Sequence, residues 1–393
     1  MPERDPAKTG DQVPSAGDDF VMKIEPEMLE SDDDFVAIVD AAAPPRRPGF
    51  GFFVGFLWCL LMLFVTQLVP GVLVLLVIVL SSLSQPATGN GDAKSINDFS
   101  NVIQNSQEYR MSLQALTVLL PVFGVLFSWV LLRKIVGKDW TKAVALRLPH
   151  WQHVVLTLVL VFPFMIFNIS FEYVFSYLTR KLHLPMFGFY DQIIETFKAY
   201  PTVILVLGAC VGPAISEELF CRGFLGRGLC SRYSIPLGVL LTSLLFGIIH
   251  VIPVQLFAAF LMGTALHFIY IASRSIIIPI ILHFSNNLIS ILSVSERSPF
   301  FLGNSLAESL NYNPIGMIVV SLFLTGLIGW AFWASRVRII SPDGKPIPPL
   351  LLKHVDLPSS SSANRAFMGE MPLVLPPLIV LACCLFGLMW YIV

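Results

Sequence analysis

The residues best suited to chemistry are two adjacent glutamates in an apolar stretch, Glu217 and Glu218, with Arg222 shortly after them. Residues four positions apart share one face of a helix, so Glu218 and Arg222 are expected to form an ion pair. Glu217 points about 100° away and has no such partner on its own helix. It would therefore stay available as a base. Alternatively, both glutamates mark the solvated end of a helix, although a helix C-terminus disfavours acidic side chains.

Histidines occur in the apolar stretches that follow. His250 comes four residues after Phe246, so the aromatic ring can pack on the imidazole and exclude lipid. Taken alone, His250 would be an interface residue, and only the glutamates make it a candidate. His283 and Asn287 are also four apart and project from one face, where a hydrogen-bonded contact between helices is the alternative explanation. His267 has no polar neighbour at helical spacing, and we interpret it as a packing residue.

These carboxylate, imidazole and amide groups favour hydrolysis. A glutamate and a histidine can activate water, while a second histidine and an asparagine can donate hydrogen bonds to an oxyanion. One carboxylate and two imidazoles can instead supply most of the first shell of a metal ion such as zinc. The sequence contains no G-x-S-x-G elbow and no H-E-x-x-H signature, so neither a serine nucleophile nor a helical zinc motif is supported.

The elements that must position these groups are membrane helices. Of the 393 residues, 55% are hydrophobic and 13% are charged, whereas an ordinary soluble domain has about 25% charged residues. This composition excludes a soluble globular enzyme, a disordered protein and a nucleic-acid binder. We expect an all-α polytopic transmembrane helix bundle of about 8–9 spans, since each needs about 20 apolar residues. The nine apolar stretches are residues 50–84, 112–132, 154–178, 201–220, 236–252, 254–272, 276–295, 314–335 and 372–393. The first is long enough to predict either one tilted helix kinked at Pro70 or a span with an interfacial segment.

Charge indicates the orientation of the chain. Lys and Arg cluster before the first stretch and after the second, fourth, sixth and eighth, which predicts a cytoplasmic N-terminus by the positive-inside rule. Residues 1–48 hold 12 acidic and five basic residues and are expected to form a disordered acidic cytoplasmic tail. The six cysteines lie in or beside apolar stretches without a C-x-x-C pair, so we interpret them as reduced and structural.

Three motifs, in order and spacing, resemble those of one family: Glu217-Glu218-x-x-x-Arg222, Phe246-x-x-x-His250 and His283-x-x-x-Asn287. The family is that of the CAAX proteases and bacteriocin-processing enzymes (CPBP, also called Abi), intramembrane endopeptidases that include type II CAAX prenyl proteases. The resemblance covers about residues 150–295.

This resemblance implies a role for each matching residue. Glu217 and His250 would activate the attacking water, and His283 and Asn287 would stabilise the oxyanion. Glu218 and Arg222 would be their supporting pair, with Phe246 beside them. The family has been described both as glutamate-dependent and as metal-dependent, so zinc held by Glu217, His250 and His283 stays open.

The resemblance, together with the apolar stretches and the charge pattern, predicts a domain organisation and a substrate class. The catalytic core would comprise residues 151–295, preceded by membrane helices and a cytoplasmic linker at 49–150. An additional span at 296–340, a polar cytoplasmic linker at 341–371 and a last span at 372–393 would follow. The expected partners are membrane lipids and a peptide or lipidated protein substrate that enters a cavity open to the cytoplasm.

Two functions from other classes compete with proteolysis. The buried glutamates and histidines could form the proton relay of a transporter, although inverted repeats with paired broken helices are not evident in the sequence. The chain could also be a membrane scaffold or immunity protein that keeps the fold without cutting. Loss of Glu217 would abolish activity in an enzyme and leave binding intact in a scaffold.

Overall fold

The computed structural model describes residues 37–38, 49–84, 107–182, 196–250, 253–294, 313–337, 339–340 and 346–347. Most of the predicted acidic tail and polar linker, and the whole of the last predicted span at 372–393, lie outside these ranges. The described residues are predominantly helical, which confirms the all-α fold class.

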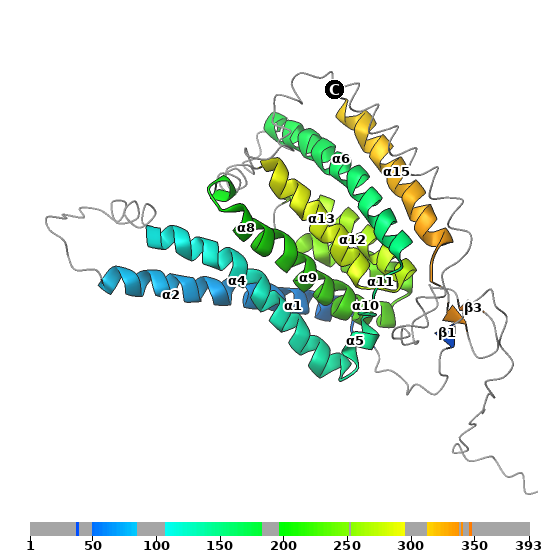
Figure 1. Cartoon of the computed structure of the whole chain (residues 1–393), viewed down its shortest axis with the longest axis horizontal. Coiled ribbons are helices and arrows are strands. Elements are labelled where there is room, and N and C mark those ends of the chain that lie inside the picture. Colours follow the sequence, from blue (N-terminus) through cyan, green and yellow to red (C-terminus); the bar gives the residue numbers. More distant parts are fainter. Residues whose placement is uncertain are drawn as a thin grey trace, which may run out of the picture. The chain divides into compact units, whose positions relative to one another are not determined.

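The described helices follow one another along the chain, with longer intervals after α2, α6 and α13 (Figure 1). In order they are α1 (Phe52–Leu63), η2 (Phe64–Leu68), α2 (Val69–Ser84), α4 (Gln107–Leu131), η3 (Leu132–Val136), α5 (Trp140–Ala143), α6 (Trp151–Lys181), α8 (Thr202–Leu205), η4 (Val206–Val211), α9 (Gly212–Glu218), η5 (Leu219–Leu225), α10 (Gly226–Arg232), α11 (Ile235–Ile248), α12 (Pro253–Ser273), α13 (Ile277–Val294) and α15 (Pro314–Ala334). The η elements are π-helical turns within longer helical runs.

Six of the described helical runs are long and apolar enough to cross a membrane: Phe52–Leu80, Tyr109–Val136, Trp151–Lys181, Thr202–Arg232, Gln255–Ser273 and Pro314–Ala334. Two shorter apolar helices, Ile235–Ile248 and Ile277–Leu292, match the fifth and seventh predicted stretches. Eight of the nine predicted stretches are therefore helical, and the ninth lies outside the described residues. The chain is a multi-pass integral membrane protein.

The first predicted stretch forms one helical run that contains a π-helical turn. This turn, η2, ends two residues before Pro70. Proline lacks the N–H that would continue the α-helical ladder, and a π turn is one way in which a helix accommodates such a break. The prediction of a single helix perturbed at Pro70 agrees with this arrangement.

The fourth predicted stretch is longer than expected. It was placed at residues 201–220, but the helical run continues to Arg232 and includes two π-helical turns, η4 and η5. Glu217 and Glu218 therefore lie in the interior of a helical run. The alternative that they mark its solvated end is wrong. The run extends past residue 220 because the charge of Arg222 is paired and buried and does not end the helix.

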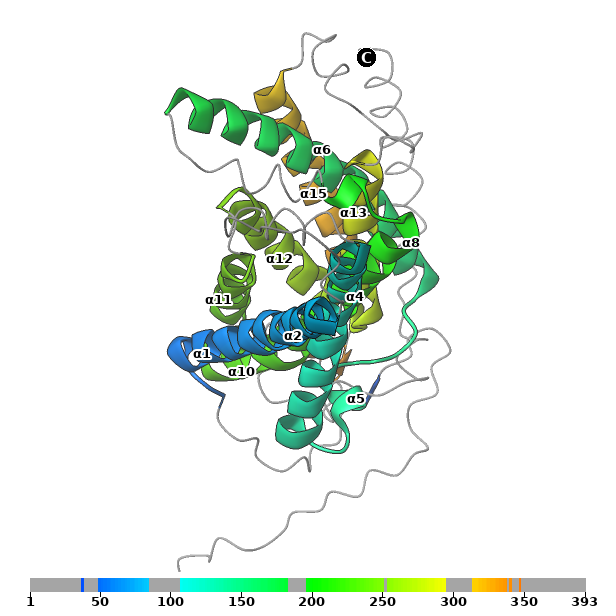
Figure 2. The ribbon, with the colours of Figure 1, turned by 90° about the vertical axis from the view of Figure 1, so that its left-hand side faces the viewer.

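Two apolar clusters hold the helices together, and the second includes part of the glutamate-bearing run. The first joins α6, α12, α13 and α15 and includes Leu160, Leu266 and Phe332. The second joins α1, α4, η5, α10 and α11 around Phe220 and Leu245. Figures 1 and 2 both show α6 beside α15, and α2 beside α4. The candidate site residues come from elements of both clusters, with α13 in the first and η5 and α11 in the second.

Close approach of α4 to the fourth run depends on glycine. A Cβ atom added to Gly208 would lie 2.5 Å from the carbonyl oxygen of Thr117, and one added to Gly212 would lie 2.4 Å from Cβ of Pro121. Small residues let membrane helices pack at short distance, where van der Waals contact replaces the hydrophobic driving force available in water. This contact fixes α9 and its glutamates against α4.

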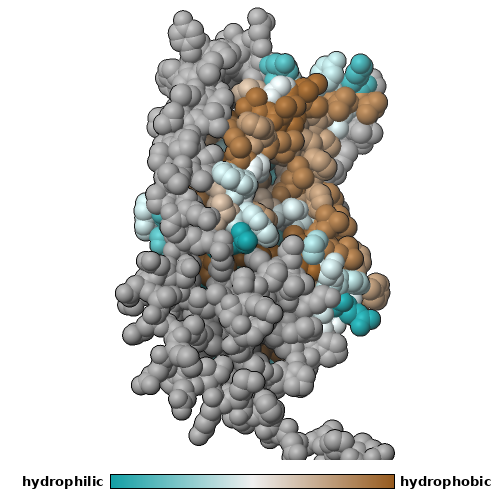
Figure 3. Space-filling model, turned by 90° about the vertical axis from the view of Figure 1, so that its right-hand side faces the viewer, coloured by the Kyte–Doolittle hydropathy of each residue, from teal (hydrophilic) through white to brown (hydrophobic). Residues whose placement is uncertain are grey.

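Many large apolar side chains of the described helices face outward. Val72, Leu75, Val77 and Phe323 are among those that are more than half exposed. Figure 3 shows one face on which apolar side chains cover much of the described surface. Extended apolar surface of this kind is expected where helices contact lipid.

Three two-residue strands complete the described structure. Strand β1 (Ala37–Ile38) pairs in parallel with β2 (Ile339–Ile340), and β2 pairs in antiparallel fashion with β3 (Pro346–Ile347). Ala37 and Ile38 lie within the segment predicted to be a disordered tail. They belong to the apolar run 36–39, whose composition suits a strand better than the acidic residues before it.

Candidate active site

The centre of the candidate site is the buried ion pair predicted from spacing. Arg222 Nη1 lies 2.8 Å from Glu218 Oε1, and the side chains of Arg222 and Glu218 are 1% and 0% exposed. Arg222 Nη2 also donates to the carbonyl oxygen of Gly263 on α12, at 3.0 Å. The arginine therefore neutralises one carboxylate and ties the fourth run to α12. Burial makes this pair sensitive to the loss of either partner.

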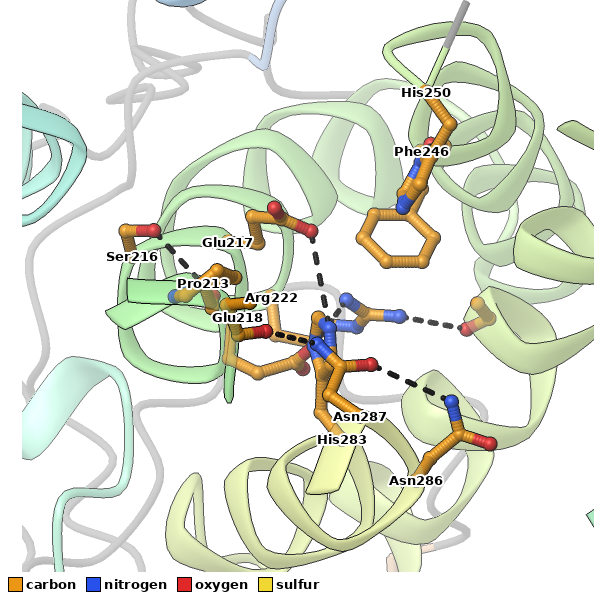
Figure 4. A network of polar contacts seen from close by, with 12 residues as sticks. Pro213, Ser216, Glu217, Glu218, Arg222, Phe246, His250, His283, Asn286 and Asn287 are labelled. Carbon is orange, nitrogen blue, oxygen red and sulfur yellow. Dashed lines mark hydrogen bonds and ion pairs between the residues drawn. The ribbon is translucent and has the colours of Figure 1, made fainter. Parts of the chain in front are cut away.

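His283 on α13 lies between the two glutamates. Its Nδ1–H donates to Glu218 Oε1 at 2.9 Å, while its Nε2 lies 3.9 Å from Glu217 Oε2 (Figure 4). The hydrogen bond to Glu218 holds the imidazole ring in one orientation, with Nδ1 carrying the donated hydrogen. The second nitrogen is then directed toward Glu217.

Glu217 has the features expected of a base. Its side chain is 21% exposed, whereas Glu218 is fully buried. Glu217 Oε2 is a buried atom without a hydrogen-bond partner among the described residues. The adjacent carboxylates thus have different environments. Glu218 is paired with Arg222, as the spacing predicted, whereas Glu217 faces the imidazole of His283, a contact that spacing did not predict.

A π-helical turn follows the two glutamates at once. It spans Leu219–Leu225 and contains Arg222. π turns add one residue to a helical turn and occur frequently at functional sites. Sequence reasoning did not predict this turn, since the sequence offers no local signal such as a proline within it.

Phe246 contacts more of the site than its spacing to His250 suggested. Its ring meets the His250 ring edge-on with centroids 4.9 Å apart, which confirms the predicted contact. It also meets His283 edge-on at 5.9 Å. The Arg222 guanidinium lies 4.7 Å from its centroid, within the range of a cation–π interaction. Phe246 therefore packs against three polar groups of the site.

His250 lies beside Phe246 but does not reach Glu217. It follows the end of α11, and its Nδ1–H donates to the carbonyl oxygen of Phe246 at 2.8 Å. No ion pair joins His250 to Glu217 in the described structure. In Figure 4 the Phe246 ring lies between His250 and His283.

Asn287 lies one turn beyond His283 on α13, in a chain of amides. Its Nδ2–H donates to the carbonyl oxygen of Ala209 at 3.1 Å. Its Oδ1 lies 3.4 Å from the Nδ2 of Asn286, whose own Oδ1 accepts a 3.0 Å bond from Asn168 on α6. Asn168 was missed by sequence reasoning. The available signal was an amide within an apolar span, where polar groups usually find partners on other helices.

His267 is buried, as expected of a packing residue, with 3% of its surface exposed. It lies against Gly226, where an added Cβ would be 2.4 Å from the His267 Cε1 atom. It also meets Tyr270 edge-on with a centroid distance of 6.2 Å. It therefore packs α12 against α10.

Glu217, His250 and His283, the side chains that could hold zinc, do not form a metal site in the described structure. Among the described residues, no three His, Cys, Asp or Glu side chains lie close enough together to hold a metal ion. Glu217 and His283 face one another, but the Phe246 ring contacts both His250 and His283. The donor types suit zinc, but in the described structure the three side chains are not placed together around one point.

The comparisons with known proteins agree with the motifs. Residues 199–289 match the family model described as Type II CAAX prenyl endopeptidase Rce1-like. Neither the search of curated proteins nor that of solved structures found a match. The matched segment runs from before α8 into α13 and includes every residue singled out above except Asn168. Over this segment the chain is similar to the type II CAAX prenyl endopeptidases, which confirms the resemblance drawn from the three motifs.

Proposed function

We propose that this protein is an intramembrane endopeptidase in which Glu217 activates a water molecule. The family match supports an endopeptidase of the CAAX type in general. The observation that carries the proposal is the placement of Glu217 Oε2, a buried carboxylate oxygen without a hydrogen-bond partner among the described residues, 3.9 Å from His283 Nε2. A small molecule such as water can contact both atoms at once.

In this mechanism Glu217 is the general base. It accepts a proton from water as the water oxygen bonds to the carbonyl carbon of the scissile peptide. The carbonyl oxygen becomes an oxyanion, which a protonated His283 stabilises through its Nε2–H. Glu217 then gives the proton to the leaving nitrogen as the carbon–nitrogen bond breaks. The products are a new carboxyl terminus and a new amine, so atoms and charges balance.

Glu218 and Arg222 are positioning residues in this scheme. Glu218 accepts the Nδ1–H bond of His283 and Arg222 neutralises Glu218. The result is an imidazole with a fixed orientation beside two carboxylates, one of which is already paired.

His250 and Asn287 are assigned to the reaction by the resemblance, and their contacts limit how they act. With Nδ1–H committed to the Phe246 carbonyl, His250 would contact the water through Nε2 without touching Glu217. Asn287 uses one amide hydrogen for Ala209, and an amide nitrogen has a second hydrogen for an oxyanion. The proposed mechanism contains no metal-dependent step, since the described side chains do not form a metal site.

The proposed substrates are membrane-associated peptides or proteins, including those with a C-terminal lipid anchor of the CAAX type. Helices with large outward-facing apolar side chains flank the site, and the glutamates lie within a run long enough to cross the membrane. A substrate whose anchor stays in the bilayer would bring its peptide to this depth. The positive-inside pattern supports entry from the cytoplasmic side.

Cleavage of a peptide library tests this function. Lipidated and unlipidated peptides would be incubated with purified protein in detergent micelles and analysed by mass spectrometry, with wild type beside Glu217→Gln. The proposal expects fragments from wild type that are lost with the variant, and their masses define the bond. If correctly folded wild-type protein cuts no peptide, proteolysis is the wrong function and transport or scaffolding gains weight.

A further inference from the structure

A second group of buried polar side chains lies outside the candidate active site, where residues 144–150 meet the turn between α12 and α13. Arg147 is 7% exposed and Arg274 is 3% exposed. The Arg147 Nε–H donates to the carbonyl of Arg274, and its Nη2–H donates to the carbonyl of Ser273 at 3.1 Å. Ser275 Oγ–H returns a bond to the Arg147 carbonyl at 2.6 Å. These bonds fix the guanidinium group of Arg147 against the backbone of residues 273–275.

The two arginines have unused hydrogen-bond donors. Within the described part of the chain, Arg147 Nη1 and Arg274 Nε and Nη2 are buried atoms without an acceptor. The Nε–H and Nη2–H of one guanidinium point in the same direction and form the fork that binds two oxygens of a carboxylate or phosphate. In Arg274 this fork is empty among the described residues.

Among the described residues, no carboxylate compensates the positive charge of this arginine pair. No ion pair joins Arg147 or Arg274 to a carboxylate among the described residues. Burial lowers the pKa of Arg147 to about 10 and that of Arg274 to about 9. A buried cation is unfavourable unless an anion or further hydrogen bonds accompany it. Two adjacent guanidinium groups attract a phosphate group and can donate hydrogen bonds to its oxygens.

The backbone at this place is also unusual. Ala145 and Arg274 both have φ of 52°, and they are the non-glycine residues of the described chain with positive φ. Glycine is the common residue in this conformation at the end of a helix. Backbone strain of this kind concentrates at ligand clamps and other functional sites. Here it places an arginine where a glycine would be easier to accommodate.

Exposed apolar side chains flank the arginine pair. Leu146 and Leu148, on either side of Arg147, are 45% and 74% exposed, and Trp151 at the start of α6 is 60% exposed. Tryptophan at the end of a span is typical of the membrane interface. A phosphate bound at this level would have lipid chains beside it.

We propose that Arg147 and Arg274 bind the phosphate of an anionic phospholipid, whose acyl chains contact Leu146, Leu148 and Trp151. Basic pockets beside membrane helices bind anionic headgroups in this way. A soluble phosphate compound shares the headgroup chemistry, but it would leave the exposed leucines without a role. The site is separate from Glu217 and does not depend on the proposed peptidase activity.

Native mass spectrometry of the detergent-solubilised full chain tests the proposal. Dioleoylphosphatidylglycerol and dioleoylphosphatidylcholine would be titrated into wild type, Arg274→Gln, Arg147→Lys and Arg133→Gln. Substitution of Arg274 should disturb the fold least, because its guanidinium makes no hydrogen bond in the described structure. The variant Arg147→Lys keeps the positive charge but loses the paired N–H donors of the guanidinium. Arg133 is an exposed arginine and serves as the matched control. Circular dichroism and size-exclusion chromatography would establish that each variant is folded.

The expected result is tighter binding of phosphatidylglycerol than of phosphatidylcholine by wild type. Arg274→Gln should weaken phosphatidylglycerol binding about fivefold, the effect of one basic side chain at an anionic surface, while Arg133→Gln should not change it. Equal binding of both lipids by wild type, or an unchanged preference in folded Arg274→Gln protein, would overturn the proposal.

Two further arms identify the source of the phosphate. Glycerol 3-phosphate at the same concentration should not displace bound phosphatidylglycerol. The variant Leu148→Ser should bind phosphatidylglycerol more weakly than wild type does, with no change in its affinity for glycerol 3-phosphate. If glycerol 3-phosphate binds as tightly as the lipid, the ligand is a soluble phosphate compound and the lipid assignment is wrong.

Discussion

Replacing Arg222 with methionine should destabilise the protein strongly, because it leaves Glu218 as a buried charge without its partner. The Glu218 side chain is 0% exposed, and Arg222 Nη1 lies 2.8 Å from its Oε1. Breaking a buried ion pair by removing one partner costs about 3–5 kcal/mol. Methionine has a similar unbranched shape, so the loss reports on charge more than on packing. The variant also loses the bond to the Gly263 carbonyl.

The double variant Arg222→Met with Glu218→Gln separates the effect of charge from that of structure. It removes both charges, so the free energy of unfolding should recover by at least about 2 kcal/mol relative to Arg222→Met alone, since coupling between contacting residues reaches about 0.5–3 kcal/mol. Arg232→Met is the control, because Arg232 is exposed at the end of α10 and surface substitutions stay within about 0.5 kcal/mol.

Unfolding in mixed detergent micelles, followed by tryptophan fluorescence, measures these differences. The reasoning is refuted if Arg222→Met costs no more than Arg232→Met. It is also refuted if the double variant is as unstable as Arg222→Met, because the penalty would then not arise from an unpaired carboxylate.

Three further predictions follow from the site. Asn168→Leu should lower kcat several-fold, because Asn168 orients Asn287 through Asn286. The free energy of unfolding should change by under about 2 kcal/mol, since single hydrogen bonds within membranes are weak. An unchanged kcat in peptide hydrolysis would contradict this positioning role. Gly226→Ala should destabilise the protein by about 1–3 kcal/mol through overpacking, since the new Cβ would lie 2.4 Å from His267 Cε1. The double variant with His267→Ala should lose less stability than the sum of the two single variants. Strict additivity in thermal unfolding would show that the two side chains do not clash. Peptide hydrolysis should persist in a strong zinc chelator, because the described side chains form no metal cluster; loss of activity on chelation, restored by zinc, would be the opposite result.

Helical spacing predicted the contacts within single helices. The Glu218–Arg222 pair and the Phe246–His250 ring contact both join residues four apart, and both are present in the structure. Such contacts depend on local geometry, which the sequence specifies directly. The apolar stretches likewise located the helices, because membrane crossing requires long apolar segments.

Contacts between helices could not be derived from spacing. The position of His283 between two glutamates, the link from Asn168 to Asn286 and the convergence of Arg147 on Arg274 all join residues more than 60 positions apart. The π-helical turns escaped prediction for the same reason, since tertiary packing decides whether a helix accommodates an extra residue. The zinc site shows what spacing cannot decide. The sequence left zinc open because it could not reveal that the Phe246 ring contacts both His250 and His283.

The central claim is that Glu217 is the catalytic base, and the most direct test is the rate of peptide hydrolysis by wild type beside Glu217→Gln. Glu172→Gln is a suitable control, since Glu172 is an exposed carboxylate on α6. The account predicts that Glu217→Gln loses at least about 100-fold in kcat, the lower range for a general base, while Glu172→Gln keeps its rate and both variants fold as wild type does. Hydrolysis by folded Glu217→Gln protein at the wild-type rate would contradict it.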